Sequence, residues 1–107
     1  MTRVRLCAEQ ELPSHGARGF HAAGLELLLV RRGDLVFAYQ NCCPHRGTTL
    51  DWFPDRFMSA DGELLQCATH GALFRIEDGL CVHGPCQGEQ LNPLRIERVD
   101  GTVWLVR

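Results

Sequence analysis

The chain has 107 residues, a formal net charge of −2 and 45% hydrophobic residues, which fits a single domain spanning residues 1–107. It contains no run of about 18 apolar residues that would cross a membrane, and its weakly acidic charge offers no basic face for nucleic acid. The first residues lack the apolar stretch of a secretory signal. We therefore expect a cytoplasmic, reducing setting, in which the six cysteines do not form a disulfide framework.

Short alternating or apolar runs bounded by turn residues recur along the chain and predict β-strands. The expected strands are Arg3–Cys7, Leu25–Val30, Leu35–Tyr39, Leu64–Gln66, Phe74–Ile76, Leu94–Val99 and Thr102–Val106. Turn residues at Arg31–Asp34 and at Asp100-Gly101 join two of the pairs into hairpins, and Asp-Gly between two such runs is a strong hairpin signal. Thr48–Phe53 is long enough for one helical turn. The sequence therefore predicts an all-β fold.

Two short segments each place a thiol and an imidazole close together. They are Cys43-Pro44-His45-Arg46-Gly47 and Cys67-Ala68-Thr69-His70-Gly71. Pro44 stiffens the first segment, and the glycine that follows each histidine permits close backbone approach or a positive φ. Two thiolates and two neutral imidazoles from separate loops suit a binuclear iron–sulfur centre, in which two cysteines hold one iron and two histidines hold the other.

A structural zinc site draws on the same donor types and is the main alternative. Its paired ligands usually stand about two to four residues apart, whereas only Pro44 separates Cys43 from His45. The spacing therefore favours the iron–sulfur centre. A zinc-stabilised interaction module remains the alternative from a different functional class.

Taken together, the pattern Cys-x-His…Cys-x-x-His resembles the Rieske [2Fe–2S] family, and the resemblance extends over nearly the whole chain. It implies a Rieske domain of small antiparallel sheets, with two cluster-binding loops at one tip. The cluster ligands that it implies are Cys43, His45, Cys67 and His70. In this family a third, proline-bearing loop covers the cluster. The segment Gly84–Gly88 is similar to that loop, and an ordinary turn is the alternative there.

The same resemblance bears on the reduction potential. Histidine ligation places Rieske clusters in a range of roughly −150 to +300 mV. High-potential members of the family join the two ligand loops by a disulfide and donate serine and tyrosine hydroxyls to the cluster. The disulfide positions are Thr48 and Thr69 in this chain, and the hydroxyl positions are Ala72 and Phe74. We therefore expect a potential at the low end of the range.

The function that the resemblance implies is electron transfer, not catalysis. A Rieske-type ferredoxin takes single electrons from a flavin- or iron–sulfur-containing reductase and passes them to a terminal oxygenase, through transient contacts with both. The chain shows no His/Asp/Glu facial triad for a second, mononuclear iron. Within the same family, the small subunit of an NAD(P)H-dependent nitrite reductase is the alternative.

Several residues near the motifs have no assigned role. The stretch Asp51–Ser59 carries three aromatic residues and a methionine, which fits a packed surface loop or, as a sharper hypothesis, a docking patch beside the cluster. Cys42 precedes a proposed ligand and would be the false ligand if the register were misread. Cys81 and Cys86 flank the proline-bearing segment; a reducing compartment favours buried thiols there, and a disulfide is the alternative.

Overall fold

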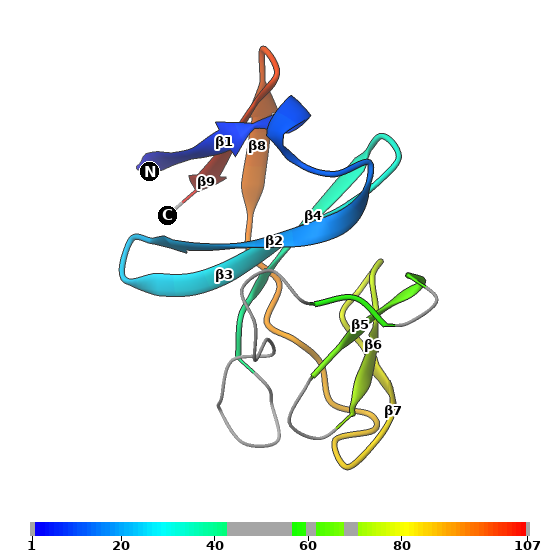
Figure 1. The fold of residues 1–107 in the computed structure, drawn as a ribbon. Helices are drawn as coiled ribbons and strands as arrows, with labels where there is room; N and C mark the ends of the chain where they lie inside the picture. Colours follow the sequence, from blue (N-terminus) through cyan, green and yellow to red (C-terminus); the bar gives the residue numbers. More distant parts are fainter. Residues whose placement is uncertain (1, 43–56, 60–61, 68–70, 107) are drawn as a thin grey trace.

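The computed structural model describes residues 2–42, 57–59, 62–67 and 71–106 of the chain. Its described strands form three antiparallel sheets of three strands each, with the orders β1-β9-β8, β2-β3-β4 and β5-β6-β7 (Figure 1). The elements are β1 (Arg3–Ala8), the short 3-10 helix η1 (Glu9–Glu11), β2 (His15–Ala22), β3 (Leu25–Arg32), β4 (Leu35–Gln40), β5 (Leu64–Gln66), β6 (Leu73–Arg75), β7 (Cys81–His83), β8 (Ile96–Val99) and β9 (Thr102–Val106). The expected all-β fold of small antiparallel sheets is confirmed. Among the described residues, no helix is long and apolar enough to span a membrane.

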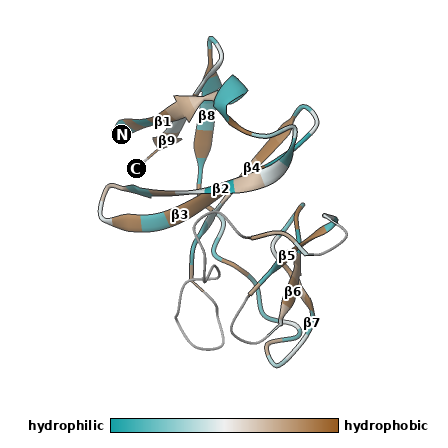
Figure 2. Ribbon diagram, viewed as in Figure 1, coloured by the Kyte–Doolittle hydropathy of each residue, from teal (hydrophilic) through white to brown (hydrophobic). Residues whose placement is uncertain are grey.

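The central strand of the middle sheet, β3, is buried on both of its faces between Leu27 and Val30. Leu27 and Leu29 of β3 contribute to a core shared with β1 and β9, whereas Leu28 and Val30 contribute to a second core shared with the third sheet. All four side chains are fully buried. This explains why β3 is an almost continuous apolar run, visible as the largely hydrophobic colour of that strand in Figure 2, because a strand covered on both faces has no solvent-facing set of positions.

Two tight turns set the register of the hairpins in the first two sheets. Asp100 and Gly101 have φ values of 50° and 75°, and Ala23 and Gly24 have φ values of 51° and 75°. Positive φ at both central residues is the geometry of the turn that matches the twist of two-residue hairpins. The expected hairpins at Asp100-Gly101 and at Arg31–Asp34 are both confirmed, and a third hairpin, between β2 and β3, is added to them.

Strand boundaries differ from the expected ones where another strand competes for the backbone. The last hairpin begins at Ile96 and not at Leu94, since the Leu94 amide donates to the carbonyl of Ala38 (2.9 Å), and Pro93 forms a bridge with Tyr39 on β4. β6 covers Leu73–Arg75, one residue earlier than expected. The helical turn expected at Thr48–Phe53 lies outside the described residues.

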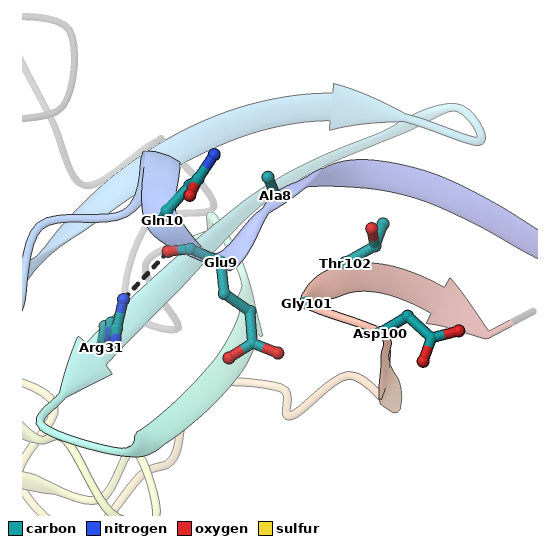
Figure 3. Close-up of a pocket in the computed structure, with 7 residues that line it drawn as sticks. All are labelled: Ala8, Glu9, Gln10, Arg31, Asp100, Gly101 and Thr102. Atoms are coloured by element: carbon teal, nitrogen blue, oxygen red, sulfur yellow. Dashed lines mark hydrogen bonds between the residues drawn. The ribbon is translucent and has the colours of Figure 1, made fainter.

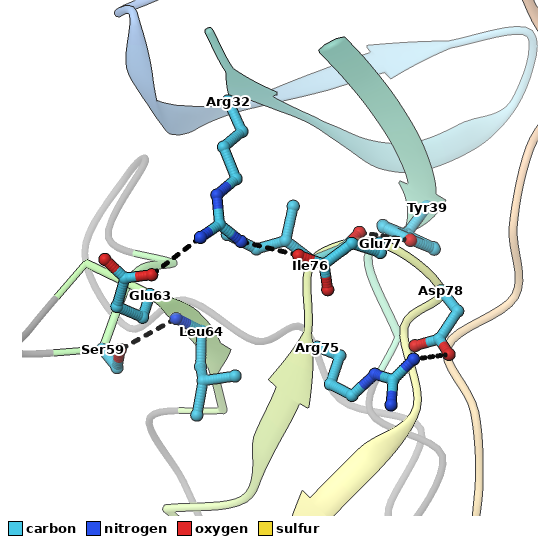
Figure 4. A network of polar contacts seen from close by, with 9 residues as sticks. All are labelled: Arg32, Tyr39, Ser59, Glu63, Leu64, Arg75, Ile76, Glu77 and Asp78. Atoms are coloured by element: carbon cyan, nitrogen blue, oxygen red, sulfur yellow. Dashed lines mark hydrogen bonds and ion pairs between the residues drawn. The ribbon is translucent and has the colours of Figure 1, made fainter.

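Polar contacts join the third sheet to the middle one. The hydroxyl of Tyr39 on β4 is buried and donates to the Ile76 carbonyl at 2.6 Å. Arg32, at the end of β3, donates to Glu77 at 2.6 Å and to Glu63 at 2.9 Å, so that one guanidinium holds two carboxylates of the third-sheet region (Figure 4). The third sheet is thus anchored at its base, and Cys67 directly follows β5.

Candidate metal centre

Cys67 is the one proposed ligand that lies within the described residues, and it stands directly after β5. Its side chain is fully buried, in the core that also holds Ala72 and Phe74. The Cys67 amide donates to the Ala72 carbonyl at 2.9 Å, and the Gly71 amide donates back to the Cys67 carbonyl at 2.8 Å. Gly71 has a φ of 67°, as the expected role of this glycine requires. These two bonds close the base of a short loop that begins at the proposed ligand.

The other proposed ligands, Cys43, His45 and His70, lie outside the described residues. The backbone that leads to the first pair is described as far as Cys42. β4 ends at Gln40, and the amides of Asn41 and Cys42 then donate to the carbonyls of Glu26 (2.8 Å) and Gln40 (2.9 Å). Within the described residues, no group of three His, Cys, Asp or Glu side chains comes together in a metal-binding arrangement. The four-residue ligand set therefore stays a prediction.

The proline-bearing segment packs against Ala72, just after the second proposed ligand loop. Gly84 has a φ of 108°, and a Cβ built on it would stand 2.8 Å from the Cα of Ala72. Ala72 is the residue whose carbonyl accepts the Cys67 amide, so the segment touches the base of that loop. Only glycine permits so close an approach. This contact could not be predicted from the sequence, because only tertiary packing brings Gly84 and Ala72 together. That this segment covers a cluster stays a prediction.

Two of the four positions that bear on the expected reduction potential lie within the described residues. Ala72 and Phe74 are both fully buried, and neither side chain carries a hydroxyl. Thr48 and Thr69, at the disulfide positions, lie outside the described residues.

The stretch before β5 is partly structural. Phe57 is fully buried in the core of the third sheet, and the Gln66 amide donates to its carbonyl at 2.7 Å. Met58 forms a bridge with Leu65. Residues 57–59 therefore behave as packed structure and not as a docking patch. Trp52 and Phe53, on which the docking hypothesis depends, lie outside the described residues.

A surface pocket lies away from Cys67, between η1 and the turn that joins β8 to β9 (Figure 3). It is lined by Ala8, Glu9, Gln10, Arg31, Asp100, Gly101 and Thr102. The guanidinium of Arg31 already donates to the carbonyls of Gly33 (2.8 Å) and Glu9 (3.0 Å). Because this cation is engaged by the fold itself, the pocket is a structural feature of the first two sheets.

Comparison with known proteins identifies the family. The model of the Rieske [2Fe–2S] domain matches residues 2–100. The chain belongs to this family. Its cofactor is therefore a [2Fe–2S] cluster, and the buried thiol of Cys67 fits one, since a soft anionic sulfur ligand is what such a cluster requires.

The relatives of this Rieske chain include ferredoxins of similar length. It is 25% identical over 103 residues to "Ferredoxin CarAc" of Metapseudomonas resinovorans, and the match covers 95% of this chain and 91% of that protein. The ferredoxin of carbazole 1,9a-dioxygenase from Nocardioides aromaticivorans IC177 superposes with a TM-score of 0.81 at 24% identity, covering 99% of this chain and 98% of that one. A chain in a complex of reduced oxygenase and oxidised ferredoxin in carbazole 1,9a-dioxygenase gives a TM-score of 0.77 at 23% identity, covering 97% of this chain and 92% of that one. The shared fold is thereby established.

Proposed function

We propose that this protein is a Rieske-type ferredoxin, an electron carrier and not an enzyme, which passes single electrons from a flavin- or iron–sulfur-containing reductase to a terminal oxygenase. The observation that carries the proposal is the end-to-end match with ferredoxins, 95% of this chain against 91% of "Ferredoxin CarAc". The likeness to a chain from an oxygenase–ferredoxin complex supports an oxygenase as the electron acceptor.

The proposed ligands divide between the two irons by donor type. Cys43 and Cys67 would hold one iron as thiolates, and His45 and His70 would hold the other as neutral imidazoles. The oxidised centre then sums to zero charge, and the reduced centre to one negative charge, so it is less costly to bury than a four-cysteine cluster with two more negative charges. When bound, the cluster supplies reversible one-electron transfer at a potential that histidine ligation raises above that of plant-type ferredoxins.

The described residues around Cys67 shield and orient that ligand. Its fully buried side chain stands among apolar neighbours, which keep water from the sulfur. The hydrogen bonds that close the loop at Gly71 and Ala72 fix its backbone, and Gly84 packs on the same point from the neighbouring segment. Ligands held in place by surrounding contacts need little rearrangement when the charge of the centre changes.

The compartment belongs to the same proposal. We place the protein in the cytoplasm, a reducing compartment that would keep the buried residues Cys81 and Cys86 as thiols.

The decisive experiment supplies the partners directly. The purified protein, with its cluster assembled anaerobically, is mixed with a flavin-containing reductase and NADH, and its reduction is followed by visible absorption and electron paramagnetic resonance. The reduced carrier is then mixed with a terminal oxygenase, and its reoxidation is measured. We expect a red-brown protein that accepts one electron and returns it to the oxygenase. A colourless protein that binds zinc in place of iron would refute the proposal, as would a reduced protein that delivers electrons only within a nitrite reductase complex.

A further inference from the structure

Two cysteines beside the second ligand loop lie in contact with one another. Cys81 belongs to β7, and Cys86 lies five residues later, in the proline-bearing segment. Their sulfurs are 3.2 Å apart, and each residue is only 2% exposed. A disulfide bond has a sulfur–sulfur length of about 2.05 Å, so bond formation requires an approach of roughly 1.2 Å by this standard.

The backbone already holds the two residues at this spacing. The Cys81 amide donates to the carbonyl of Glu89 at 2.8 Å, the Gly88 amide donates to the carbonyl of Cys81 at 3.1 Å, and the Glu89 amide donates to the carbonyl of Cys86 at 2.9 Å. The chain after Cys86 thus folds back on β7, and Gly88 and Glu89 are bonded to Cys81 there. A cross-link between the two sulfurs would join positions that the hydrogen bonds have brought together, so it requires little backbone movement.

We propose that Cys81 and Cys86 form a redox-sensitive pair, which interconverts between two thiols and a disulfide through exchange with a small-molecule disulfide such as oxidised glutathione. One protein thiolate attacks the small disulfide, releases one small thiol and forms a mixed disulfide. The second protein thiolate then attacks the sulfur of the first and releases the other small thiol. The protein loses two protons and two electrons, and the small disulfide gains them.

Access to the sulfurs comes through the segment itself. Its backbone is on the surface, since Pro85, Gln87 and Gly88 are exposed, while the sulfur of Cys86 points into the core. The Gln87 amide donates to the Gly84 carbonyl at 3.2 Å, and the whole segment is only five residues long, from Gly84 to Gly88. Local opening of the segment would present both thiols to a small oxidant.

Oxidation of the pair would affect the second proposed ligand loop. Gly84 lies against Ala72, and the Ala72 carbonyl holds the amide of Cys67. Fastening Cys86 to β7 would limit the opening of the segment that makes this contact. The pair differs in place from Thr48 and Thr69, the positions at which high-potential family members carry a disulfide. The Cys81–Cys86 disulfide would instead restrain the loop through β7 and the proline-bearing segment.

The test uses the cluster-loaded protein, equilibrated anaerobically with mixtures of reduced and oxidised glutathione. Samples are quenched with acid, the remaining thiols are alkylated, and the peptides are mapped by mass spectrometry. We expect a peptide cross-linked between Cys81 and Cys86, lighter by two hydrogens, which grows as the mixture becomes more oxidising and disappears on addition of dithiothreitol. Cys86→Ser should abolish it, and the control Cys7→Ser, at a buried thiol of the first two sheets, should leave it unchanged.

A second measurement tests the effect on the segment. Amide hydrogen exchange at residues 84–89 should be slower in the oxidised protein than in the reduced one, with no change in β3. Full alkylation of both cysteines at every glutathione ratio would overturn the proposal, as would a glutathione adduct that never resolves to a Cys81–Cys86 cross-link, or a bond from Cys86 to another cysteine. Because the wild-type protein alone decides these points, a variant that failed to fold would not obscure the answer. A cross-link without slower exchange would overturn the effect on the segment.

Discussion

The first two sheets and the third sheet are stabilised in different ways. Strands of the first two sheets are four to eight residues long, whereas β5, β6 and β7 have three residues each. Short strands form few ladder hydrogen bonds and bury little surface by themselves. The third sheet therefore depends on what it packs against, which includes β3 and β4 on one side and, by the proposed function, a metal cluster at its other end. We call the first two sheets the framework.

Substitution of Cys67 should produce the largest difference in stability between the third sheet and the framework. Cys67→Ala removes a proposed cluster ligand, so we expect complete loss of the visible absorbance of the cluster. Metal binding couples to folding, so amide exchange in β5, β6 and β7 should also become faster, while β3 stays protected. Cys42→Ser is the control and should keep its cluster, and Cys43→Ser should lose it. The opposite result for Cys42 and Cys43 would show that the first ligand pair is misassigned.

The same division explains how much the sequence could predict. The framework strands β3, β4 and β9 carry strong apolar patterns, and all three were predicted. β2 was not, because its sequence includes Gly16, Gly19 and two histidines and forms a strand only by pairing with β3. β7 was missed because its three residues, Cys81–His83, are too few to show a period.

For the site, spacing and donor chemistry sufficed to propose the ligands, since ligand type is encoded in individual residues. The contacts that surround them are not encoded in this way. The approach of Gly84 to Ala72 and the meeting of Cys81 with Cys86 depend on how β7 and the following segment pack. A local sequence pattern does not show which distant residue a side chain will contact in the folded protein.

Two glycines of the proline-bearing segment provide the next test, because they differ mainly in their neighbours. Gly84 and Gly88 both have positive φ, but a Cβ at Gly84 would meet Ala72 at 2.8 Å, whereas a Cβ at Gly88 would meet nothing within 4 Å. Gly84→Ala should lower the free energy of unfolding by roughly 1–3 kcal/mol more than Gly88→Ala, since overpacking against backbone costs about that much. It should also speed release of the cluster to a chelator. Equal stability of the two variants would mean that the segment does not depend on this contact.

The hydroxyl of Tyr39 tests the junction between framework and third sheet. Tyr39→Phe leaves the Ile76 carbonyl without its buried donor, which should cost about 1–3 kcal/mol of unfolding free energy. Chemical denaturation monitored by circular dichroism measures this difference.

Tyr39 also predicts that the stability of the protein falls at alkaline pH. Burial, with smaller contributions from Asp78 and Glu77, raises the pKa of Tyr39 to about 12, above its unfolded value of roughly 10. Stability from this group is thus fully present below pH 10 and is lost as the pH rises from about 10 to about 12. The loss should be smaller in Tyr39→Phe. An identical alkaline profile in both proteins would contradict the assignment.

The smallest effect is expected from Arg32, because its ion pairs are on the surface. It bridges Glu63 and Glu77 with a side chain that is 40% exposed, and exposed pairs are worth about 0.2–1 kcal/mol each. Arg75→Gln is the matched control, since the Arg75–Asp78 pair (2.7 Å) is similarly exposed but lies within the third-sheet region alone. Both variants should lose a little stability at low salt. Only Arg32→Gln should speed amide exchange throughout the third sheet relative to β3, and about 1 M salt should remove that difference by screening. If Arg75→Gln has the same effect on the whole sheet, the pairs of Arg32 do not anchor it to the framework, and the junction depends on Tyr39 and the shared apolar core.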